Sequence, residues 1–351
     1  MGERDVFAYI GENKRTIVLS FIAVAVLIFI IGLFAGFGDI LRALERTSPY
    51  FLALNFLLEA LILVLWTLRW RLILNLVDDA PSFPRLMMLL FASIFGNNIT
   101  PGAAGGEPLR AYLLREVEGT PFEIGFASST ADRVFEFIPF AVISILSAVL
   151  IMTWSISIWT RVVVSVLIFF TIAFFSAAIY AGMNRDIAQR LALSVVRRAV
   201  EWVSRFRKGD ISFSRIHERV IFYINRFSEG FSTAITDKRV FMAGFFVSLG
   251  MWALDVCRLY VCFLAVGVSP PAVPLIIIYT VGILISLLPL LPGSLGLREG
   301  ILVGLFAVAG IGADYVMAAS VVDRIASYFA PTIIGFLAAL YYGRYIMAPG
   351  D

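Results

Sequence analysis

The sequence predicts an all-α polytopic membrane protein with two inverted repeats, about six full spans and two re-entrant helical hairpins. The first observation is composition: of the 351 residues, 60% are hydrophobic and 15% are charged, and the mean hydropathy is +0.91. A soluble domain averages about 45–50% apolar and about 25% charged residues. The second observation is the recurrence of apolar stretches of roughly 20 residues, the length that crosses a bilayer. The third is a pair of proline- and glycine-rich turns, each followed by an Asp-Arg pair.

Six stretches are long and apolar enough to be full spans. They cover residues 16–38, 50–77, 121–154, 162–184, 240–266 and 316–342. Two further apolar stretches, residues 86–117 and 274–313, contain proline and glycine turns where a lipid-exposed helix would not end. Irregular backbone at membrane depth is tolerated only where protein buries it or where it lines a cavity. These two stretches are therefore expected to enter the membrane and return on the same side.

The segment 185–239 differs from the rest of the chain because it carries twelve Lys or Arg residues against six Asp or Glu residues. Apolar residues recur in it every three to four positions, which predicts two amphipathic helices broken near residues 208–210. Basic amphipathic helices next to spans are expected on the cytoplasmic membrane surface. The alternative is that the charges only set the topology. Placing both chain ends and this segment in the cytoplasm accounts for each basic cluster of a multi-pass protein of the cell (plasma or inner) membrane.

The two glycine-rich turns are related by an internal repeat. A shift of 191 residues sets Pro101 and Gly102 on Pro292 and Gly293, and it sets the pair at 132–133 on the pair at 323–324. The expected topology gives the two copies opposite orientations, as in transporters whose broken helices form a site at the bilayer midplane. The alternative is a duplication retained only for packing.

The repeat divides the chain, which we expect to form one membrane domain over residues 1–351. Its parts are listed in order: an N-terminal span at 1–49, repeat one at 50–154, a connecting span at 155–184, the basic helices at 185–239 and repeat two at 240–345.

Charged residues inside the spans are the candidates for function, because ionisable groups at membrane depth are costly. Helix N-termini at the two turns would present free N–H groups, which bind phosphates and carboxylates. Glu107 is expected at the cap of the first of these helices, because Pro108 suits its first turn. The candidate substrate-binding residues are Asn98, Thr100, Gly105, Gly106, Glu107, Arg110, Asp132, Arg133, Glu136, Arg258, Gly293, Gly296, Arg298, Glu299, Asp323 and Arg324.

The alternative interpretation of these charges is structural: the acidic residues and the arginines form ion pairs that hold one repeat against the other. Asp255 is a further charge within a span. Arg69 and Arg71 lie near the end of their span, so we expect them to reach the interface by snorkelling. Glu59 has no partner that the sequence can identify.

Several classes of function are excluded by the residues that the chain contains. Two cysteines and one histidine leave no ordinary zinc or di-iron site. Each Asp of the two repeat-related pairs is followed by Arg, which would hold it ionised, and the chain lacks the GxGD pattern of intramembrane aspartyl proteases. It also lacks a phosphate-binding P-loop for ATP. Because the net charge is only +3, we expect no nucleic-acid partner. From the missing residues and motifs, we also expect no cofactor, no metal and no enzymatic activity.

The motifs resemble a known family. The runs NNITPGAAGGEPLRAYLL, ADRVFE, LLPGSLGLREG and VDRIASY are similar to the flippase-like membrane domain of the lysylphosphatidylglycerol synthases. That domain moves an aminoacylated lipid across the membrane, whereas a separate soluble domain makes the lipid. The 351 residues do not include such a soluble domain, so the resemblance implies translocation by a stand-alone member. Many stand-alone relatives are linked to isoprenoid-lipid or glycolipid pathways, which leaves the lipid open.

The expected function is therefore that of a lipid flippase for a polar-headed lipid, with a phospho-, aminoacyl- or glyco- head group. Its phosphate would sit at a half-helix N-terminus with Arg110 or Arg298, and Glu107 and Glu299 would meet a cationic or hydroxyl group. Membrane lipids are the expected partners, and the oligomeric state stays open. One alternative is an ion-coupled secondary transporter of a small polar solute. Another is a membrane scaffold for a lipid-modifying glycosyltransferase, docked through residues 185–239.

Overall fold

The structure, a computed structural model, describes residues 45, 47–100, 105–154, 157–206, 213–286 and 296–347. This part of the chain is helical and contains no strand, which confirms an all-α membrane fold. Five helices are long and apolar enough to cross a membrane: Pro49–Leu74, Phe122–Leu150, Arg161–Met183, Lys238–Ala265 and Ala313–Gly343. They coincide with five of the six expected spans. The first expected span, at 16–38, lies outside the described residues.

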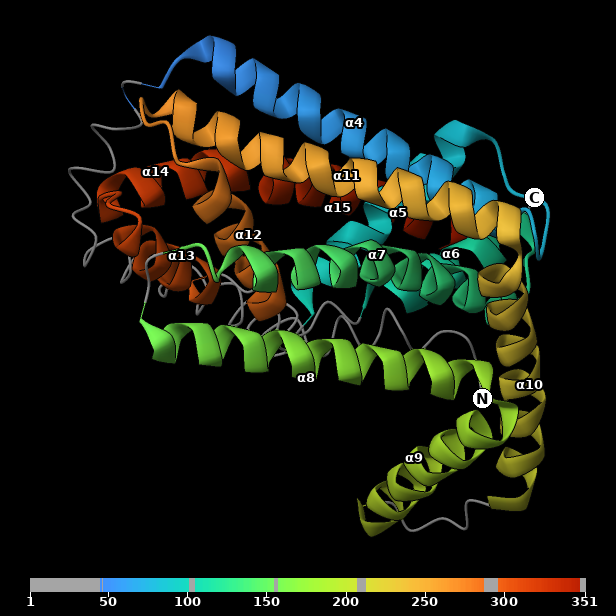
Figure 1. The fold of residues 1–351 in the computed structure, drawn as a ribbon. Helices are drawn as coiled ribbons and strands as arrows, with labels where there is room; N and C mark the ends of the chain where they lie inside the picture. Colours follow the sequence, from blue (N-terminus) through green and yellow to red (C-terminus); the bar gives the residue numbers. More distant parts are fainter. Residues whose placement is uncertain are drawn as a thin grey trace.

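The long helices α4 (Pro49–Leu74) and α11 (Lys238–Ala265) pack extensively against each other. They lie side by side with opposite chain directions (Figure 1). The backbone N–H of Ser48 at the start of α4 donates to the carbonyl of Ala265 at the end of α11, at 3.4 Å. Asp237 caps α11, because its carboxylate accepts from the N–H groups of Arg239 and Val240.

Two pairs of short helices occupy the stretches for which the sequence predicts hairpins. In the first pair, α5 (Phe83–Ile99) packs against α6 (Gly106–Glu118). In the second, α12 (Ala272–Ser286) packs against α13 (Leu297–Val308). Gly119 ends α6 with a left-handed φ of 79°, a conformation that glycine adopts without steric cost. That both pairs dip into the membrane from one side stays a prediction.

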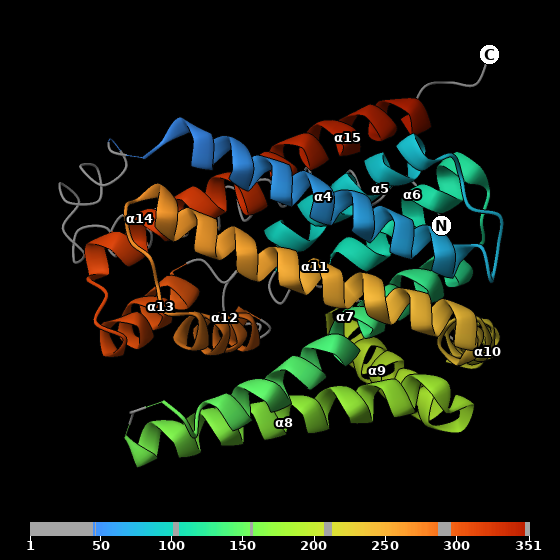
Figure 2. The same ribbon diagram turned by 45° about the horizontal axis from the view of Figure 1, so that its top comes forward.

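The helix contacts of the two predicted repeats correspond one by one. In the first, α4 and α7 (Phe122–Leu150) each pack against one another and against the hairpin of α5 and α6. In the second, α11 packs on α14 (Ala313–Arg324) and on α12, and α14 also packs on α13. Corresponding helices run in opposite directions through the bundle (Figures 1 and 2). This arrangement agrees with an inverted repeat, whose orientation relative to a membrane stays a prediction.

The counterpart of α7 in the second half is not one regular helix. It consists of α14, a π-helical turn η1 (Ile325–Phe329) and α15 (Ala330–Met347). Asp132 and Asp323 are 191 residues apart, whereas Pro139 in α7 and Pro331 in α15 are 192 residues apart. A π-helical turn holds one residue more than an α-helical turn needs. The extra residue of the second half is therefore taken up between Asp323 and Pro331, where η1 lies.

The basic segment forms two helices, α9 (Arg185–Phe206) and α10 (Phe213–Thr236), as predicted, and the break at 208–210 lies outside the described residues. Both helices leave the main bundle beyond the end of α8 (Ile158–Met183; Figure 1). The second half of α10 packs on α7, and Phe231 is 2% exposed. The bundle therefore covers the apolar face of this half of α10, and the place of the two helices on the cytoplasmic membrane surface stays a prediction.

The outer surface of the bundle is apolar where a membrane would surround it. On α8, the aromatic side chains of Phe169, Phe170 and Phe174 are each at least 66% exposed. On α15, Ile333 and Leu337 are also largely exposed. Large contiguous apolar surfaces are rare on soluble proteins and mark contact with lipid or with other proteins. The exposed residues thus agree with the multi-pass assignment.

Candidate functional site

A buried charge cluster ties together three helices of the first half. We name it the Asp132 cluster, and it consists of Trp66 and Arg69 of α4, Arg110 of α6 and Asp132 of α7. The carboxylate of Asp132 accepts from Arg69 Nε at 2.7 Å, from Trp66 Nε1 at 2.6 Å and from an Arg110 Nη at 3.1 Å. Arg69, Arg110 and Asp132 are each at most 2% exposed. The expectation that Arg69 snorkels is therefore wrong, because a carboxylate of a neighbouring helix holds its guanidinium in the interior.

Arg110 is enclosed further by aromatic rings. Its guanidinium carbon lies 4.4 Å from the ring centroid of Trp70 and 5.7 Å from that of Trp66. Such stacking favours a cation over an aromatic face. With 1% of its surface exposed, Arg110 has no open face for a substrate phosphate in this conformation.

The next residue along α7 makes a second ion pair with the same short helix. Arg133 Nε donates to a carboxylate oxygen of Glu107 at 2.6 Å, and both side chains are partly exposed. Glu107 lies in the first turn of α6, two positions further in than the expected cap, since Gly105 is the N-cap residue. Asp132 and Arg133 of α7 therefore each form an ion pair with a residue of α6.

The second half repeats this arrangement around Asp323 of α14. We name the group of Arg258, Arg298 and Asp323 the Asp323 cluster. One oxygen of Asp323 accepts from Arg258 of α11, and the other accepts from Arg298 of α13 at 3.3 Å. Arg324 donates to Glu299 at 2.8 Å, as Arg133 does to Glu107. In each half an Asp-Arg pair therefore binds one long helix and one short helix, so packing accounts for these charges.

The two halves also exchange contacts across the central helix pair. Arg69 of α4 donates to Ser248 Oγ of α11 at 2.8 Å. Conversely, Arg258 of α11 pairs with Glu59 of α4 at 3.3 Å. Arg69 and Arg258 are 189 residues apart, and so are Glu59 and Ser248. The two contacts are therefore counterparts, and Glu59, which the sequence could not place, belongs to the second of them.

The N-termini of the short helices, predicted to bind anions, already have acceptors. Thr100 Oγ1 accepts from the N–H of Gly105 at 2.8 Å, and Asn97 Oδ1 accepts from that of Gly106 at 2.7 Å. In α13 the N–H of Gly296 donates to Glu299 at 2.7 Å. Side-chain caps thus satisfy N–H groups that a phosphate would use. These three N–H groups therefore have protein acceptors, and a phosphate at the turns stays a prediction.

The remaining predicted residues have structural contacts. Asn98 donates to Thr332 of α15 at 2.6 Å, and its carbonyl accepts from Tyr328 OH at 3.0 Å. A side chain at Gly106 would collide with the amide of Asn97, so the turn requires glycine there. Gly293 lies outside the described residues.

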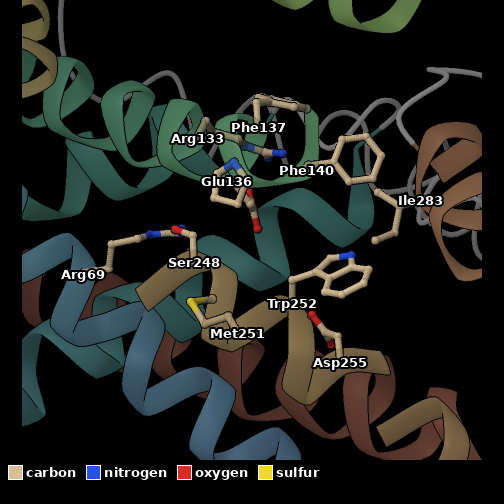
Figure 3. A pocket seen from close by; sticks show the side chains of 11 residues that line it. Arg69, Arg133, Glu136, Phe137, Phe140, Ser248, Met251, Trp252, Asp255 and Ile283 are labelled. Carbon is tan, nitrogen blue, oxygen red and sulfur yellow. The ribbon is translucent and has the colours of Figure 1, made fainter. Parts of the chain in front are cut away.

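A pocket of about 250 Å³ lies between α4, α7, α11 and α12. Glu136 is halfway along α7, and Met251 and Trp252 are halfway along α11. A pocket at this level of two membrane-crossing helices is far from both membrane surfaces. The residues that line it are Arg69, Arg133, Glu136, Phe137, Pro139, Phe140, Ser248, Met251, Trp252, Asp255 and Ile283 (Figure 3).

The pocket has a polar side and an apolar side. Glu136 reaches from α7 toward α11, while Phe140 and Ile283 close the opposite side (Figure 3). Arg69 Nη2 and Trp252 Nε1 are buried donor atoms that have no hydrogen-bond partner among the described residues. Buried donors without a partner are uncommon and call for a ligand or water. This combination is typical of a ligand site, with apolar walls and a few polar groups.

The pocket brings together two of the predicted residues, Arg133 and Glu136, and excludes the rest. The sequence did not identify Ser248, Met251 and Trp252 as site residues. Ser248 and Met251 carry no charge and occur in an ordinary apolar span. A tryptophan in mid-span was the one available signal, because tryptophan is enriched at membrane interfaces rather than in the centre of spans.

Comparison with known proteins agrees with these features. A family model described as the lysylphosphatidylglycerol synthase TM region matches residues 17–335. Two UPF0104 membrane proteins of Methanothermobacter thermautotrophicus are 86% identical over 98% of this chain and 98% of the relative, and 33% identical over 93% and 94%. The glycosyltransferase AglD of Haloferax volcanii is 26% identical over 93% of this chain and 54% of its own. The chain therefore belongs to the family of the lysylphosphatidylglycerol synthase membrane region.

Proposed function

We propose that this protein is a translocase that moves a polar-headed lipid between the two leaflets of the cell membrane. The observation that carries the proposal is the polar pocket halfway along α7 and α11, in a bundle whose outer surface is apolar. A lipid head group crosses the bilayer only if polar groups replace its water at mid-depth. The pocket offers such groups, and the acyl chains would stay in the surrounding lipid.

The arrangement of the helices supports this proposal over that of a rigid scaffold. Corresponding helices of the two halves run in opposite directions and make corresponding contacts. In many transporters, two such halves rock against each other and open a central site to either side in turn. In this protein the pocket is lined by residues of both halves, since α4 and α7 belong to one half and α11 and α12 to the other.

The family and one relative are consistent with a lipid as the substrate. The matched family is the membrane region of synthases whose name refers to a phospholipid. The relative AglD carries the name of a glycosyltransferase, which fits the idea that a lipid-modifying enzyme works beside this domain. We assign no bond-making step to the chain itself. We place both chain ends and helices α9 and α10 in the cytoplasm.

The proposal is tested with the purified protein in liposomes that contain fluorescent lipids. A membrane-impermeant reductant quenches only the outer leaflet, so movement of inner lipids appears as extra quenching. Met251→Trp should slow this movement at least tenfold, because Met251 is 6% exposed and its side chain lines the pocket. Met242→Trp on the same helix should leave it unchanged, because Met242 is 50% exposed.

Ser248→Leu serves as a second variant in case the larger tryptophan prevents folding. Each variant is compared with the wild type by gel filtration and thermal unfolding before transport is measured. If the wild-type protein moves no lipid in a panel of anionic, zwitterionic and glycosylated head groups, the translocase proposal is refuted. A free polar solute that accumulates in the liposomes would then favour a solute transporter.

A further inference from the structure

We infer that the pocket between α7 and α11 binds a neutral polyhydroxylated group, a sugar ring, rather than a phosphate or an ammonium group. This inference deepens the proposed function, on which it rests for the statement that the sugar is carried by a lipid. It depends on the balance of charge in the pocket, on the donors that lack a partner, and on the aromatic walls.

The charges that line the pocket cancel. Arg69 and Arg133 contribute two positive charges, and Glu136 and Asp255 contribute two negative charges. Three of these four groups are already in ion pairs, Arg69 with Asp132, Arg133 with Glu107 and Asp255 with Arg258, so neither guanidinium is available to neutralise an added anion. A phosphate would face two carboxylates without a surplus of positive charge. An ammonium group would lie beside the guanidinium groups of Arg69 and Arg133, whereas a neutral group adds no charge to this buried and largely paired set.

The polar atoms require a ligand that both donates and accepts hydrogen bonds. Arg69 Nη2 and Trp252 Nε1 are donors without partners in the described part of the chain. Glu136 offers acceptor oxygens on the opposite wall, and no ion pair joins it to another described residue. A phosphate would satisfy the donors and not the carboxylate, while an ammonium group would do the reverse. A hydroxyl group is donor and acceptor at once, so a ring with several hydroxyl groups satisfies both walls.

The apolar surfaces suit a ring. Trp252 extends into the pocket from α11, and Phe140 lies across from it on α7 (Figure 3), where Phe137 also contributes to the lining. The indole of Trp252 is held in place by an edge-to-face contact with Tyr279, at a centroid distance of 6.2 Å. The C–H faces of a sugar ring are apolar and its rim is polar, which matches flat aromatic walls beside fixed hydrogen-bonding groups.

The corresponding place in the second half lacks these features. Glu136 corresponds to Ser327 with the 191-residue offset and to Tyr328 with the 192-residue offset, and both of these uncharged residues lie in η1. Tyr328 is 8% exposed, and its hydroxyl group donates to the carbonyl of Asn98. With the 189-residue offset of the central helices, the counterpart of Trp252 is Leu63, which is 6% exposed. The described residues at this place in the second half therefore do not repeat the Glu136 carboxylate and the Trp252 indole.

The experiment compares three fluorescent lipids with the same acyl chains: monoglucosyl diacylglycerol, phosphatidylglycerol and phosphatidylethanolamine. The protein is purified and reconstituted without sugar-based detergents, because these would occupy the pocket. We expect the glucosyl lipid to move at least tenfold faster than the other two lipids. Glu136→Gln and Trp252→Phe should each slow it about tenfold, since each alters one hydrogen bond to a buried group.

The control variants are Glu229→Gln and Trp159→Leu, whose side chains are exposed and lie outside the pocket. Both should move the glucosyl lipid at the wild-type rate. Trp252→Phe keeps an aromatic ring but removes the N–H group together with the fused five-membered ring, so its thermal unfolding is compared with that of the wild type to separate lost packing from the lost hydrogen bond.

The outcomes separate this inference from the proposed function. If phosphatidylglycerol or phosphatidylethanolamine moves as fast as the glucosyl lipid, the sugar inference is overturned and the translocase proposal stands. If no lipid moves but free glucose raises the unfolding temperature of the wild type and not of Trp252→Phe, the sugar site stands and the translocase proposal fails. If neither lipid movement nor stabilisation by glucose is found, both are overturned.

Discussion

Replacing Asp132 with alanine should destabilise the protein more than almost any other single change in the described part of the chain. Asp132 is 2% exposed, and its two oxygens accept from Arg69, Arg110 and Trp66 at 2.6–3.1 Å. Its removal leaves two buried guanidinium groups without their carboxylate. Breaking a buried ion pair by removing one partner costs roughly 3–5 kcal/mol. We expect Asp132→Ala to lower the free energy of unfolding by this amount.

The assay is equilibrium unfolding in mixed micelles of a mild detergent and sodium dodecyl sulfate, followed by tryptophan fluorescence and circular dichroism. Asp79→Ala is the matched control, because Asp79 is exposed, and its effect should stay within about 0.5 kcal/mol. In the Asp132→Ala background, Arg110→Leu should restore about 1 kcal/mol or more, since it removes one of the two unpaired charges. A loss below about 1 kcal/mol for Asp132→Ala would show that this cluster does not hold α4, α6 and α7 together.

Two further predictions concern packing. Gly335→Ala should lower the free energy of unfolding by about 1–3 kcal/mol, because a side chain there would collide with the carbonyl of Phe91 and push α15 away from α5. Gly304→Ala, where a side chain would meet open space, should not be destabilising in the same unfolding assay. N-ethylmaleimide should modify exposed Cys257 in the folded protein in mild detergent, and buried Cys262 only after denaturation. Intact mass spectrometry counts the adducts, and two adducts on the folded protein would contradict the packing of α11.

The spans could be predicted because apolar length and composition are properties of a single segment. Five of six expected spans have counterparts among the described helices, and the hairpins follow from their prolines and glycines. The repeat could be found because the Asp-Arg pairs keep their distance from the turns. The amphipathic helices α9 and α10 follow from their periodicity, whereas the surface that covers α10 depends on α7, far away in sequence.

The site was predicted only in part, because its chemistry arises between helices. Arg69 lies near the end of α4, where snorkelling is the usual fate of arginine. Its burial depends on Asp132, which is 63 residues further along the chain. The charges at the turns suggested ligand binding, yet Glu107 and Glu299 pair with arginines of their own half. Glu136 was predicted on its charge alone, while the neighbours that give it a pocket are largely uncharged.

The π-helical turn after Arg324 shows how a duplicated chain can change its length without losing its shape. One additional residue in an α-helix rotates everything beyond it by about 100°, which would turn Gly335 away from α5. Because the extra residue is confined to η1, the second half keeps this contact, while the position that corresponds to Glu136 falls within η1, at uncharged Ser327 or Tyr328. The two halves share an arrangement of helices and differ in the side chains that they place at this level, so a ligand in the bundle would meet a carboxylate on one side and uncharged groups on the other.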